Sequence, residues 1–489
     1  MKLKPVMFVG TGSDVGKSVI NAAFCRIFRQ DGYEPAPFKA QNMSLNSYAT
    51  PDGLEIGSAQ AVQAEACGID CHTDMNPVLL KPTSDISCQV VLHGKPIGNQ
   101  TASEYFIQTD RETLFKEVVT AFRRLEQNYN PIVMEGAGSI SEVNLWSKDI
   151  TNMRIALKTN AAVFLVTDID RGGIFGSVYG TMQLLPPEER NLIRGIIINK
   201  FRGDLNLFLD GKAILEKLTG VPVVGIIPWF KDIHIDDEDS VVLTGKRNHG
   251  QAASLTIAVV LLHHMSNFTD FNALERLAGV HLVYASHPSD LERADIIILP
   301  GSKNTISDLM YLRQSGMAKE ILEAHAKKKS IYGICGGYQM MGESIHDPYH
   351  VEGDIPSIPG LNILPVTTTL SQSKITEQRK FHFLNDKKIC TGYEIHMGDT
   401  FADVPSPLCM KKDGSGDGYV LNPHTWGTYM HGIFDNEAVI KHIFQVHCLK
   451  NTLPLQDYAA FKEEQYDKLA ALVRENCSME YIYQVIQIE

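Results

Sequence analysis

A glycine-rich segment near the amino terminus has the composition of a phosphate-binding loop. The segment Gly10-Thr-Gly-Ser-Asp-Val-Gly-Lys-Ser18 follows an apolar run and precedes an amphipathic helical pattern. Glycines let the backbone pass close to phosphates, and a helix N-terminus presents free N–H groups to an anion. We therefore predict that Gly10 and Gly16 shape a nucleotide site. Lys17 would reach the β- and γ-phosphates and Ser18 would ligate Mg²⁺. Five residues separate Gly10 from Gly16, whereas the usual motif has four.

Two further charged residues of the first half fit the same nucleotide site. Glu135 ends the apolar run Ile132-Val-Met-Glu135, and ligands bind at the carboxyl ends of strands in open α/β sheets. A carboxylate there suits Mg²⁺, which prefers oxygen ligands. Lys39, in Phe38-Lys-Ala-Gln-Asn42, offers a second cation for a transferring phosphoryl group. Either residue taken alone is more often a satisfied polar group at a strand end. The neighbouring glycine-rich loop favours the functional interpretation.

A cysteine in the second half lies in the pattern of a nucleophile elbow. Gly333-Ile-Cys335-Gly-Gly337 follows an apolar run and opens a helical pattern, so a tight turn projects the Cys335 thiol. The helix N-terminus favours the thiolate, and the Gly336 N–H can hold an oxyanion. Gly301, in Leu299-Pro-Gly301, could supply a second oxyanion N–H. His431, in Gly427-Thr-Tyr-Met-His431, is the expected general base.

Most of the nine cysteines carry no comparable signal, and no C-x-x-C motif occurs. Cys67, Cys71 and His72 could be interpreted as a metal cluster. However, the spacing of the two cysteines also suits two core residues on one helical face. We predict a structural role for both.

Length and charge limit the classes of function. A chain of 489 residues is expected to hold two or three domains. The formal net charge of −12 argues against broad binding to nucleic acid or anionic lipid. No apolar run reaches the roughly 18 residues of a membrane helix, and the first residues have too short an apolar core for a signal peptide. We predict a cytoplasmic, multidomain protein, and homo-oligomerisation is left open.

Alternating apolar runs and helical patterns predict the elements that position these residues. We expect buried parallel strands in both halves, at Val6–Val9, Ile132–Met134, Ala161–Val166, Gly195–Ile198, Val221–Ile227, Leu255–Leu262, Ile296–Leu299 and Ser330–Ile334. The charged, apolar-poor stretch between the halves predicts a linker. The expected boundaries are 1–232 for a nucleotide domain, 233–253 for the linker, 254–450 for a thiol-bearing domain and 451–489 for a helical segment.

An ATP-type site and a thiol elbow on one chain suggest coupled chemistry. Forming an amide from a carboxylate and ammonia needs activation of the carboxylate, commonly by phosphoryl transfer. A cysteine elbow can hydrolyse the side-chain amide of glutamine through a thioester and release ammonia. The combination predicts a glutamine-dependent amide ligase.

The chain resembles the cobyric acid synthase family in stretches that run nearly end to end. The matching stretches are Thr11–Ser18, Phe38–Ser44, Met75–Asp85, Thr167–Gly173, Ile198–Asp204, Ser266–Phe271, Pro300–Thr305, Gly333–Gln339, Gly392–Gly398 and Gly427–His431. The resemblance implies a dethiobiotin-synthetase-like parallel-sheet P-loop domain followed by a class I glutamine amidotransferase α/β domain. It also implies that Cys335 is the nucleophile, that His431 is its base, and that Lys17, Ser18 and Glu135 hold MgATP.

The substrate that the resemblance implies is adenosylcobyrinic acid a,c-diamide, amidated at its b, d, e and g carboxylates with glutamine as nitrogen donor. For corrinoid contacts we consider Asp149, Arg171 and Arg202, and more broadly a patch that includes Lys39, Lys81 and Lys200. One departure concerns the histidine. Many class I amidotransferases carry His-Pro-Glu, but here the sequence continues His431-Gly-Ile-Phe-Asp435. The third member of the triad is therefore vacant or supplied from elsewhere.

Three alternatives remain at this point. Cobyrinic acid a,c-diamide synthase shares both domain types, although Ala40–Asn46 and Asp168–Gly173 favour the four-amidation enzyme. A nucleotide-switch ATPase with a decayed glutaminase domain would lack the nucleophile or its base, and both are present. A non-catalytic corrinoid-binding module would need neither Lys17 nor Cys335.

Overall fold

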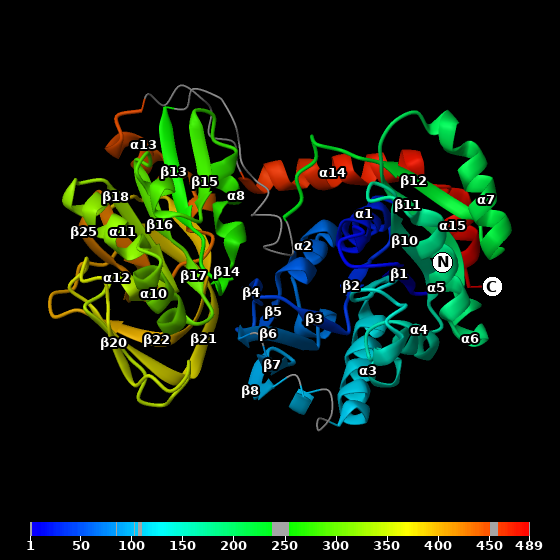
Figure 1. The fold of residues 1–489 in the computed structure, drawn as a ribbon, viewed down its shortest axis with the longest axis horizontal. Coiled ribbons are helices and arrows are strands. Elements are labelled where there is room, and N and C mark those ends of the chain that lie inside the picture. Colours follow the sequence, from blue (N-terminus) through cyan, green and yellow to red (C-terminus); the bar gives the residue numbers. More distant parts are fainter. Residues whose placement is uncertain are drawn as a thin grey trace.

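The chain forms two α/β units that lie side by side, with both termini on the same one (Figure 1). The computed structural model describes residues 2–84, 86–101, 103–105, 110–236, 254–449 and 458–488. We refer to 2–236 as the amino-terminal unit and to 254–449 as the carboxy-terminal unit. The predicted linker lies mostly in 237–253, outside the described residues. Its first residues do not stand free, because Ile233 and Ile235 pack against the core of the amino-terminal unit.

The amino-terminal unit is built on a six-stranded parallel sheet in the order β12-β11-β10-β1-β9-β2. Its strands are β1 (Val6–Gly10), β2 (Ala36–Phe38), β9 (Ile132–Glu135), β10 (Ala162–Asp168), β11 (Ile193–Phe201) and β12 (Val223–Pro228). All five strands predicted for this half are therefore present. Parallel strands buried on both faces are apolar throughout, and every residue of β1 and β9 is buried.

Helices cover both faces of this sheet, and successive residues of β1 alternate between the two. Val6 and Phe8 pack with α1 (Lys17–Gln30), whereas Met7 and Val9 pack with α3 (Arg111–Asn128) on the other face. The remaining helices of the unit are α2 (Ser58–Cys67), α4 (Met153–Thr159), α5 (Ile174–Leu184), α6 (Pro187–Arg190) and α7 (Leu209–Thr219). Because α2 ends at Cys67 and Gly68 is left-handed, Cys71 is not on the same helix. The expected helical pair was wrong, although both cysteines are buried and free.

Short strands project from the amino-terminal unit toward its neighbour. One sheet has the order β3-β6-β7-β8, and β4 pairs with β5. These strands are β3 (Gln41–Met43), β4 (Ser47–Ala49), β5 (Glu55–Gly57), β6 (Val78–Ser84), β7 (Ser87–Leu92) and β8 (Lys95–Thr101). Figure 1 shows them between the main sheet and the carboxy-terminal unit. They follow directly from the edge strand β2, so the nucleotide sheet and the unit interface are close in sequence.

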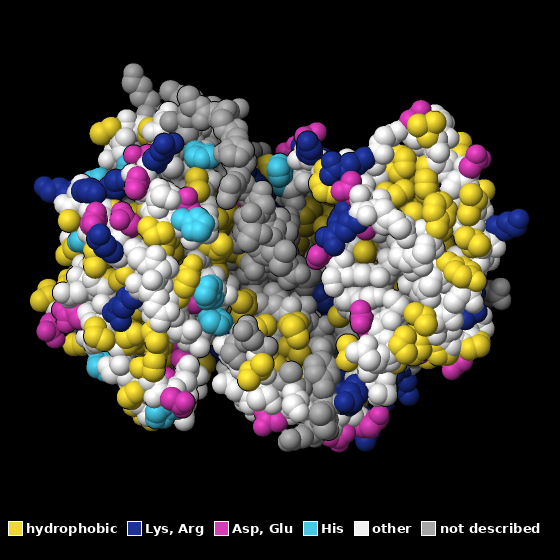
Figure 2. All heavy atoms as spheres, viewed as in Figure 1, with side chains coloured by type: hydrophobic (Ala, Val, Ile, Leu, Met, Phe, Trp, Pro, Cys, Tyr) yellow, Lys and Arg dark blue, Asp and Glu magenta, His cyan; other side chains and the backbone are white. Residues whose placement is uncertain are grey.

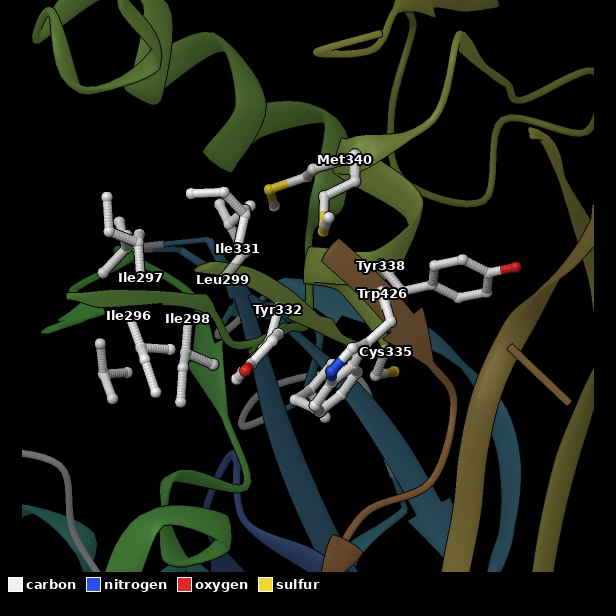
Figure 3. Packing of buried hydrophobic residues seen from close by; sticks show 14 of the residues in the cluster. Ile296, Ile297, Ile298, Leu299, Ile331, Tyr332, Cys335, Tyr338, Met340 and Trp426 are labelled. Atoms are coloured by element: carbon white, nitrogen blue, oxygen red, sulfur yellow. The ribbon is translucent and has the colours of Figure 1, made fainter. Parts of the chain in front are cut away.

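The carboxy-terminal unit has a second central sheet in the order β15-β13-β16-β18-β26-β25, parallel except for β25. Its strands are β13 (Leu255–Val260), β15 (Val280–Ala285), β16 (Ile296–Leu299), β18 (Ser330–Ile334), β25 (Tyr419–Asn422) and β26 (Thr425–Thr428). Its helices are α8 (Asn272–Glu275), α9 (Pro288–Leu291), α10 (Thr305–Gln314), α11 (Met317–Ala326), α12 (Gly336–Met341) and α13 (Glu437–Val446). The core gathers around β16, β18 and Trp426 (Figure 3).

A further sheet of this unit carries a long hairpin. It contains β19 (Ser344–His346), β20 (Ser357–Pro359), β21 (Thr367–Phe383), β22 (Ile389–Phe401), β23 (Cys409–Lys411) and β24 (Gly416–Asp417). The Pro- and Gly-rich stretch Gly353–Pro365 has the composition of a loop, but it contains β20. Two-residue strands β14 (Met265–Ser266) and β17 (Gly301–Ser302) pair with each other.

The last helices return to the first unit. Helix α14 (Tyr458–Asn476) lies beside α1, and α15 (Met479–Ile486) completes the same core. Figure 1 shows α14, in red, reaching across the top of the molecule. Among the described residues, no helix combines the length and apolarity needed to span a bilayer. Figure 2 shows hydrophobic side chains on the visible face of the amino-terminal unit. Leu207 of this unit is 86% exposed.

Candidate active site

The glycine-rich loop lies at the carboxyl end of β1 and leads into α1. Gly16 has φ 95°, and a Cβ there would lie 2.1 Å from Nδ2 of Asn199, so only glycine fits. The Lys17 ammonium is buried and donates to the carbonyl oxygens of Gly12 and Gly138, at 3.0 Å each. The loop therefore encloses a cation at a helix N-terminus, which is the arrangement that binds phosphate.

Glu135 is the centre of a hydrogen-bond network next to this loop. Its Oε1 accepts from the Ser18 hydroxyl at 2.7 Å and from the Lys39 ammonium at 3.1 Å. Its Oε2 accepts from Nε2 of Gln63 at 2.8 Å. The structure thus brings Ser18, Glu135 and Lys39 together from three separate stretches of sequence. Gln63 was missed, because a glutamine in the middle of a helix carries no motif.

A cavity of about 820 Å³ runs along this end of the sheet. Lys39 and Met43 lie at the edge that faces the carboxy-terminal unit, and Lys200 and Trp229 line it at the β11–β12 end. A smaller cavity of about 250 Å³ adjoins it and shares Met43 and Gly138 with it. The smaller cavity has a mainly apolar lining from Met43, Ile140, Leu145 and Trp146, together with Arg111.

The three residues considered for substrate binding lie in different places. Asp149 borders the small cavity, where its carboxylate accepts from the backbone N–H groups of Thr151 and Asn152 and fixes that loop. Burial raises the pKa of Asp149. Arg171 lines the large cavity and pairs with Asp14 at 3.6 Å. Arg202 pairs with Asp170 at 2.8 Å and stacks on Trp229.

Cys335 occupies the turn between β18 and α12. Its φ of 50° and ψ of −111° are uncommon for a non-glycine residue, as expected of a strained nucleophile elbow. Figure 3 shows it beside the packed core residues of β18. The two glycines expected at an oxyanion site lie close by. A Cβ on Gly336 would be 2.8 Å from the Ser302 backbone nitrogen, and one on Gly301 would be 3.2 Å from Cε1 of His431.

His431 joins Cys335 to a carboxylate that the sequence analysis did not identify. Nδ1 of His431 lies 2.7 Å from Oδ2 of Asp270, while Oδ1 of Asp270 accepts from the Gly432 N–H at 2.8 Å. The Cys335 thiol is near enough to help raise the pKa of His431, and its Sγ donates to the Ile395 carbonyl oxygen at 3.6 Å. The histidine and Asp270 are both almost fully buried. From the sequence, the third position was vacant or supplied from elsewhere. Asp270, the carboxylate that contacts His431, lies 161 residues earlier, within the matching stretch Ser266–Phe271.

The electrostatics of this site favour charge separation between thiol and imidazole. Burial lowers the pKa of His431, but Asp270 and Cys335 more than offset burial and raise the pKa to about 10. The imidazole is then protonated at neutral pH. An adjacent imidazolium stabilises a thiolate, so the arrangement is suited to nucleophilic attack by sulfur followed by proton donation.

A cavity of about 300 Å³ lies beside Cys335 and is lined by residues of both units. The carboxy-terminal unit contributes Lys303 and Lys374, and the amino-terminal unit contributes Lys81 and Asn99. Glu55 is fully buried between Lys81 and Lys374. Burial, with the other lysines, lowers the pKa of Lys303 to about 7, and burial lowers that of Lys374 to about 8. Lys81 therefore belongs to the thiol cavity and not to the nucleotide cavity.

Comparisons with known proteins agree with this division. Residues 6–241 match the model of a CobQ/CobB/MinD/ParA nucleotide binding domain. Residues 256–439 match that of a CobB/CobQ-like glutamine amidotransferase domain.

Relatives match over nearly the whole chain. It is 60% identical to a cobyric acid synthase of Parabacteroides distasonis, covering 99% of both chains. It is 58% identical to a cobyric acid synthase of Bacteroides fragilis, over 99% of this chain and 98% of that one. A relative with the same name in Lachnoclostridium phytofermentans is 44% identical over 99% of each chain.

Proposed function

Because the chain belongs to the cobyric acid synthase family, we propose that it uses ATP and glutamine to amidate a corrinoid in cobalamin biosynthesis. The substrate is adenosylcobyrinic acid a,c-diamide, and its b, d, e and g carboxylates become amides. The observation that carries the proposal is the presence, on one chain, of the Lys17–Glu135 nucleotide site and the Cys335–His431–Asp270 site. We propose that domain 1–232 carries out the ATP-dependent step and that domain 254–450 hydrolyses glutamine.

The carboxy-terminal unit produces ammonia from glutamine. The Cys335 thiolate attacks the carbonyl carbon of the side-chain amide, and the Gly301 and Gly336 N–H groups hold the resulting oxyanion. The His431 imidazolium donates its proton to the departing nitrogen, so the C–N bond breaks and ammonia leaves. Water, deprotonated by His431, then hydrolyses the thioester to glutamate. Asp270 keeps the imidazole oriented and stabilises its charged form, which is lost when His431 donates its proton and restored when it takes one from water.

The amino-terminal unit activates the carboxylate. Lys17 and Lys39 stabilise negative charge on the transferring phosphoryl group, and Gly10 and Gly16 let the loop backbone approach it. Ser18 and Glu135 present a hydroxyl and a carboxylate 2.7 Å apart, an oxygen donor pair that fits Mg²⁺ completed by phosphate oxygens. Mg²⁺ supplies charge neutralisation there. Phosphoryl transfer to the corrinoid carboxylate gives a mixed anhydride, and ammonia displaces phosphate from it.

We propose that the corrinoid binds on the side of the nucleotide site from which ammonia arrives. Ser47 and Asn46 contact the carboxy-terminal unit, so the acceptor carboxylate lies at the Lys39–Met43 end of the large cavity. We propose that the adjoining, mainly apolar cavity at Leu145 and Trp146 receives the apolar edge of the macrocycle. Arg171 and Arg202, the other candidates, lie toward the opposite end.

Paired leucine variants distinguish the two ends. Leu145→Asp should weaken corrinoid affinity by roughly tenfold or more, because burying a leucine side chain contributes about 1.5–3 kcal/mol. Leu207→Asp, the same change at a leucine of this unit that is 86% exposed, should leave that affinity unchanged. Titration of the corrinoid against each variant measures this. Weakened binding in Arg171→Ala or Arg202→Ala, with normal binding in Leu145→Asp, would move the substrate to the β11–β12 end.

Replacing Asp270 should slow glutamine hydrolysis and change its pH profile. A charge-assisted hydrogen bond contributes about 1.5–3 kcal/mol, so Asp270→Asn should lower the rate roughly 10- to 10²-fold. Because Asp270 raises the pKa of His431, its loss should move the alkaline limb of the rate profile to lower pH. Initial rates of glutamate release between neutral and alkaline pH measure both effects. An unshifted alkaline limb would show that Asp270 does not set the charge of His431.

Product analysis tests the function itself. With MgATP and glutamine, the protein should convert the a,c-diamide to a product that carries four new amides, detectable by mass spectrometry. Cobyrinic acid without amides serves as the comparison substrate. Preferential amidation of that acid at the a and c positions would identify a cobyrinic acid a,c-diamide synthase instead. ATP hydrolysis without any change in corrinoid mass would favour a nucleotide switch.

A further inference from the structure

One short segment of the carboxy-terminal unit supports two parts of the thiol site. Residues Met265–Phe271, which we name the support segment, begin with β14, and Ser266 pairs there with Gly301 of β17. Near its end the segment carries Asp270, whose Oδ2 lies 2.7 Å from Nδ1 of His431. A displacement of this segment would therefore move both the glycine at the oxyanion position and the carboxylate behind the histidine.

The middle of the support segment is bound by the other unit through two reciprocal hydrogen bonds. The Ser47 N–H donates to Oδ1 of Asn267 at 3.0 Å, and the Phe268 N–H donates to Oδ1 of Asn46 at 3.3 Å. Asn46 is 2% and Asn267 3% exposed. Each asparagine thus accepts from the opposite backbone in a water-excluded interface, where the loss of one partner leaves a buried N–H unsatisfied. We name this pair the asparagine clasp.

The clasp is connected to the nucleotide site by a short stretch of chain. Lys39, seven positions before Asn46 in the sequence, pairs with Glu135. Between them, Nδ2 of Asn42 donates to Gln60 at 3.2 Å on α2. The same helix supplies Gln63 to Glu135. The groups around Glu135 are therefore linked to the clasp by α2 and by the chain from Lys39 to Asn46.

Resting on the proposed function, we infer that Asn46 and Asn267 are positioning residues for glutamine hydrolysis. The amino-terminal unit, through Asn46 and Ser47, sets the place of Asp270 and of the Gly301 strand. Ammonia is then released at full rate only when the nucleotide framework is in position. Neither asparagine touches the reacting atoms, and both act through the support segment.

The backbone at Asn267 determines which substitutions are informative. Its φ is 52°, a left-handed conformation that asparagine and glycine adopt more readily than other residues. Asn267→Gly therefore removes the acceptor without forcing the backbone to change, and Asn267→Asp keeps an oxygen acceptor. Gln378→Ala is a matched control, because Nε2 of Gln378 donates across the same interface to the Ala49 carbonyl at 2.9 Å, a bond that does not involve the support segment.

The experiment compares three rates in the full-length protein: glutamate release, ammonium-supported amidation and glutamine-supported amidation. Asn267→Gly and Asn46→Ala should each lower glutamate release about tenfold, as expected for one lost hydrogen bond in a buried network. The effect should be on kcat rather than on KM for glutamine. Ammonium-supported amidation, which also reports correct folding, should be unchanged in both variants. For Gln378→Ala, the ratio of glutamate release with MgATP and corrinoid to glutamate release without them should equal that of the wild type. Asn267→Asp should recover most of the rate.

Two results would overturn the inference. One is an Asn267→Gly variant that releases glutamate at the normal rate and whose glutamate release MgATP and corrinoid increase as much as in the wild type. The other is an equal loss in Gln378→Ala, which would indicate a general weakening of the interface. Glutamate release is measured without reference to the corrinoid product. A wild-type protein that hydrolyses glutamine but does not amidate the corrinoid would therefore contradict the proposed function and still leave the clasp comparison decisive.

Discussion

The Cys335→Ser variant is expected to lose glutamine-supported amidation and to retain ammonium-supported amidation. Removal of a catalytic nucleophile costs on the order of 10⁴–10⁶ in rate. The hydroxyl of serine is far less ionised than a thiol beside the His431 imidazolium, so it cannot replace the thiolate. The nucleotide site, which is in the other unit, should be unaffected. Amide formation measured with glutamine and with ammonium chloride as alternative nitrogen sources separates the two activities.

A second cysteine provides the control for this variant. Cys448 is free and exposed, so Cys448→Ser should retain both activities and should show that loss of a thiol as such has no effect. Equal loss of amidation with glutamine and with ammonium chloride in Cys335→Ser would contradict the separation of ammonia production from ligation.

The Lys17→Ala variant should lose amidation from either nitrogen source. The Lys17 side-chain ammonium donates to two backbone carbonyl oxygens at the glycine-rich loop. A bound phosphate would replace these oxygens as its hydrogen-bond acceptor. Removing one electrostatic group from a charged transition state typically costs on the order of 10²–10³ in rate. Ammonium-supported amidation and ATP consumption measure the loss.

Glutamate release by the Lys17→Ala protein should persist at a basal level, because Cys335 lies in the other unit. Lys158→Ala, which removes an exposed lysine at the end of α4, serves as the charge control. Full amidation by the Lys17→Ala protein would show that the glycine-rich loop is not the phosphate site.

The local elements of both units could be predicted because their signals lie in continuous sequence. Apolar runs such as Ile132–Glu135 are buried over their whole length. Gly16 precedes the helix that begins at Lys17, and the helix after Cys335 begins with Gly336. The fold class was confirmed by the two parallel sheets and by the matching family models. In each case the pattern that determines the element is complete within a few residues.

Features that depend on tertiary contacts could not be predicted. Asp270 reaches His431 because η6 (Phe268–Phe271) lies against η7 (Ile433–Asp435), just after His431, and no spacing rule connects positions that far apart. Lys81 resembled a substrate contact, but its strand faces the thiol cavity. Cys71 failed as a helical partner of Cys67 because Gly68 ends the helix between them.

The contacts between the two units explain how the rate of glutamine hydrolysis can be matched to the rate of amidation. The cavity beside Cys335 has walls from both units, so ammonia is released where the amino-terminal unit already encloses it. The asparagine clasp joins that enclosure to the nucleotide framework. Hydrolysis of glutamine would then be slow when no acceptor is ready.

Isotope tracing tests the central claim most directly. The protein is incubated with the corrinoid a,c-diamide, MgATP and glutamine labelled with nitrogen-15 at its side-chain amide, and the corrinoid is examined by mass spectrometry. The account predicts a product in which all four new amides carry the label, and predicts no amidation when ATP is omitted. An unchanged corrinoid, or amides that form without the label, would contradict it.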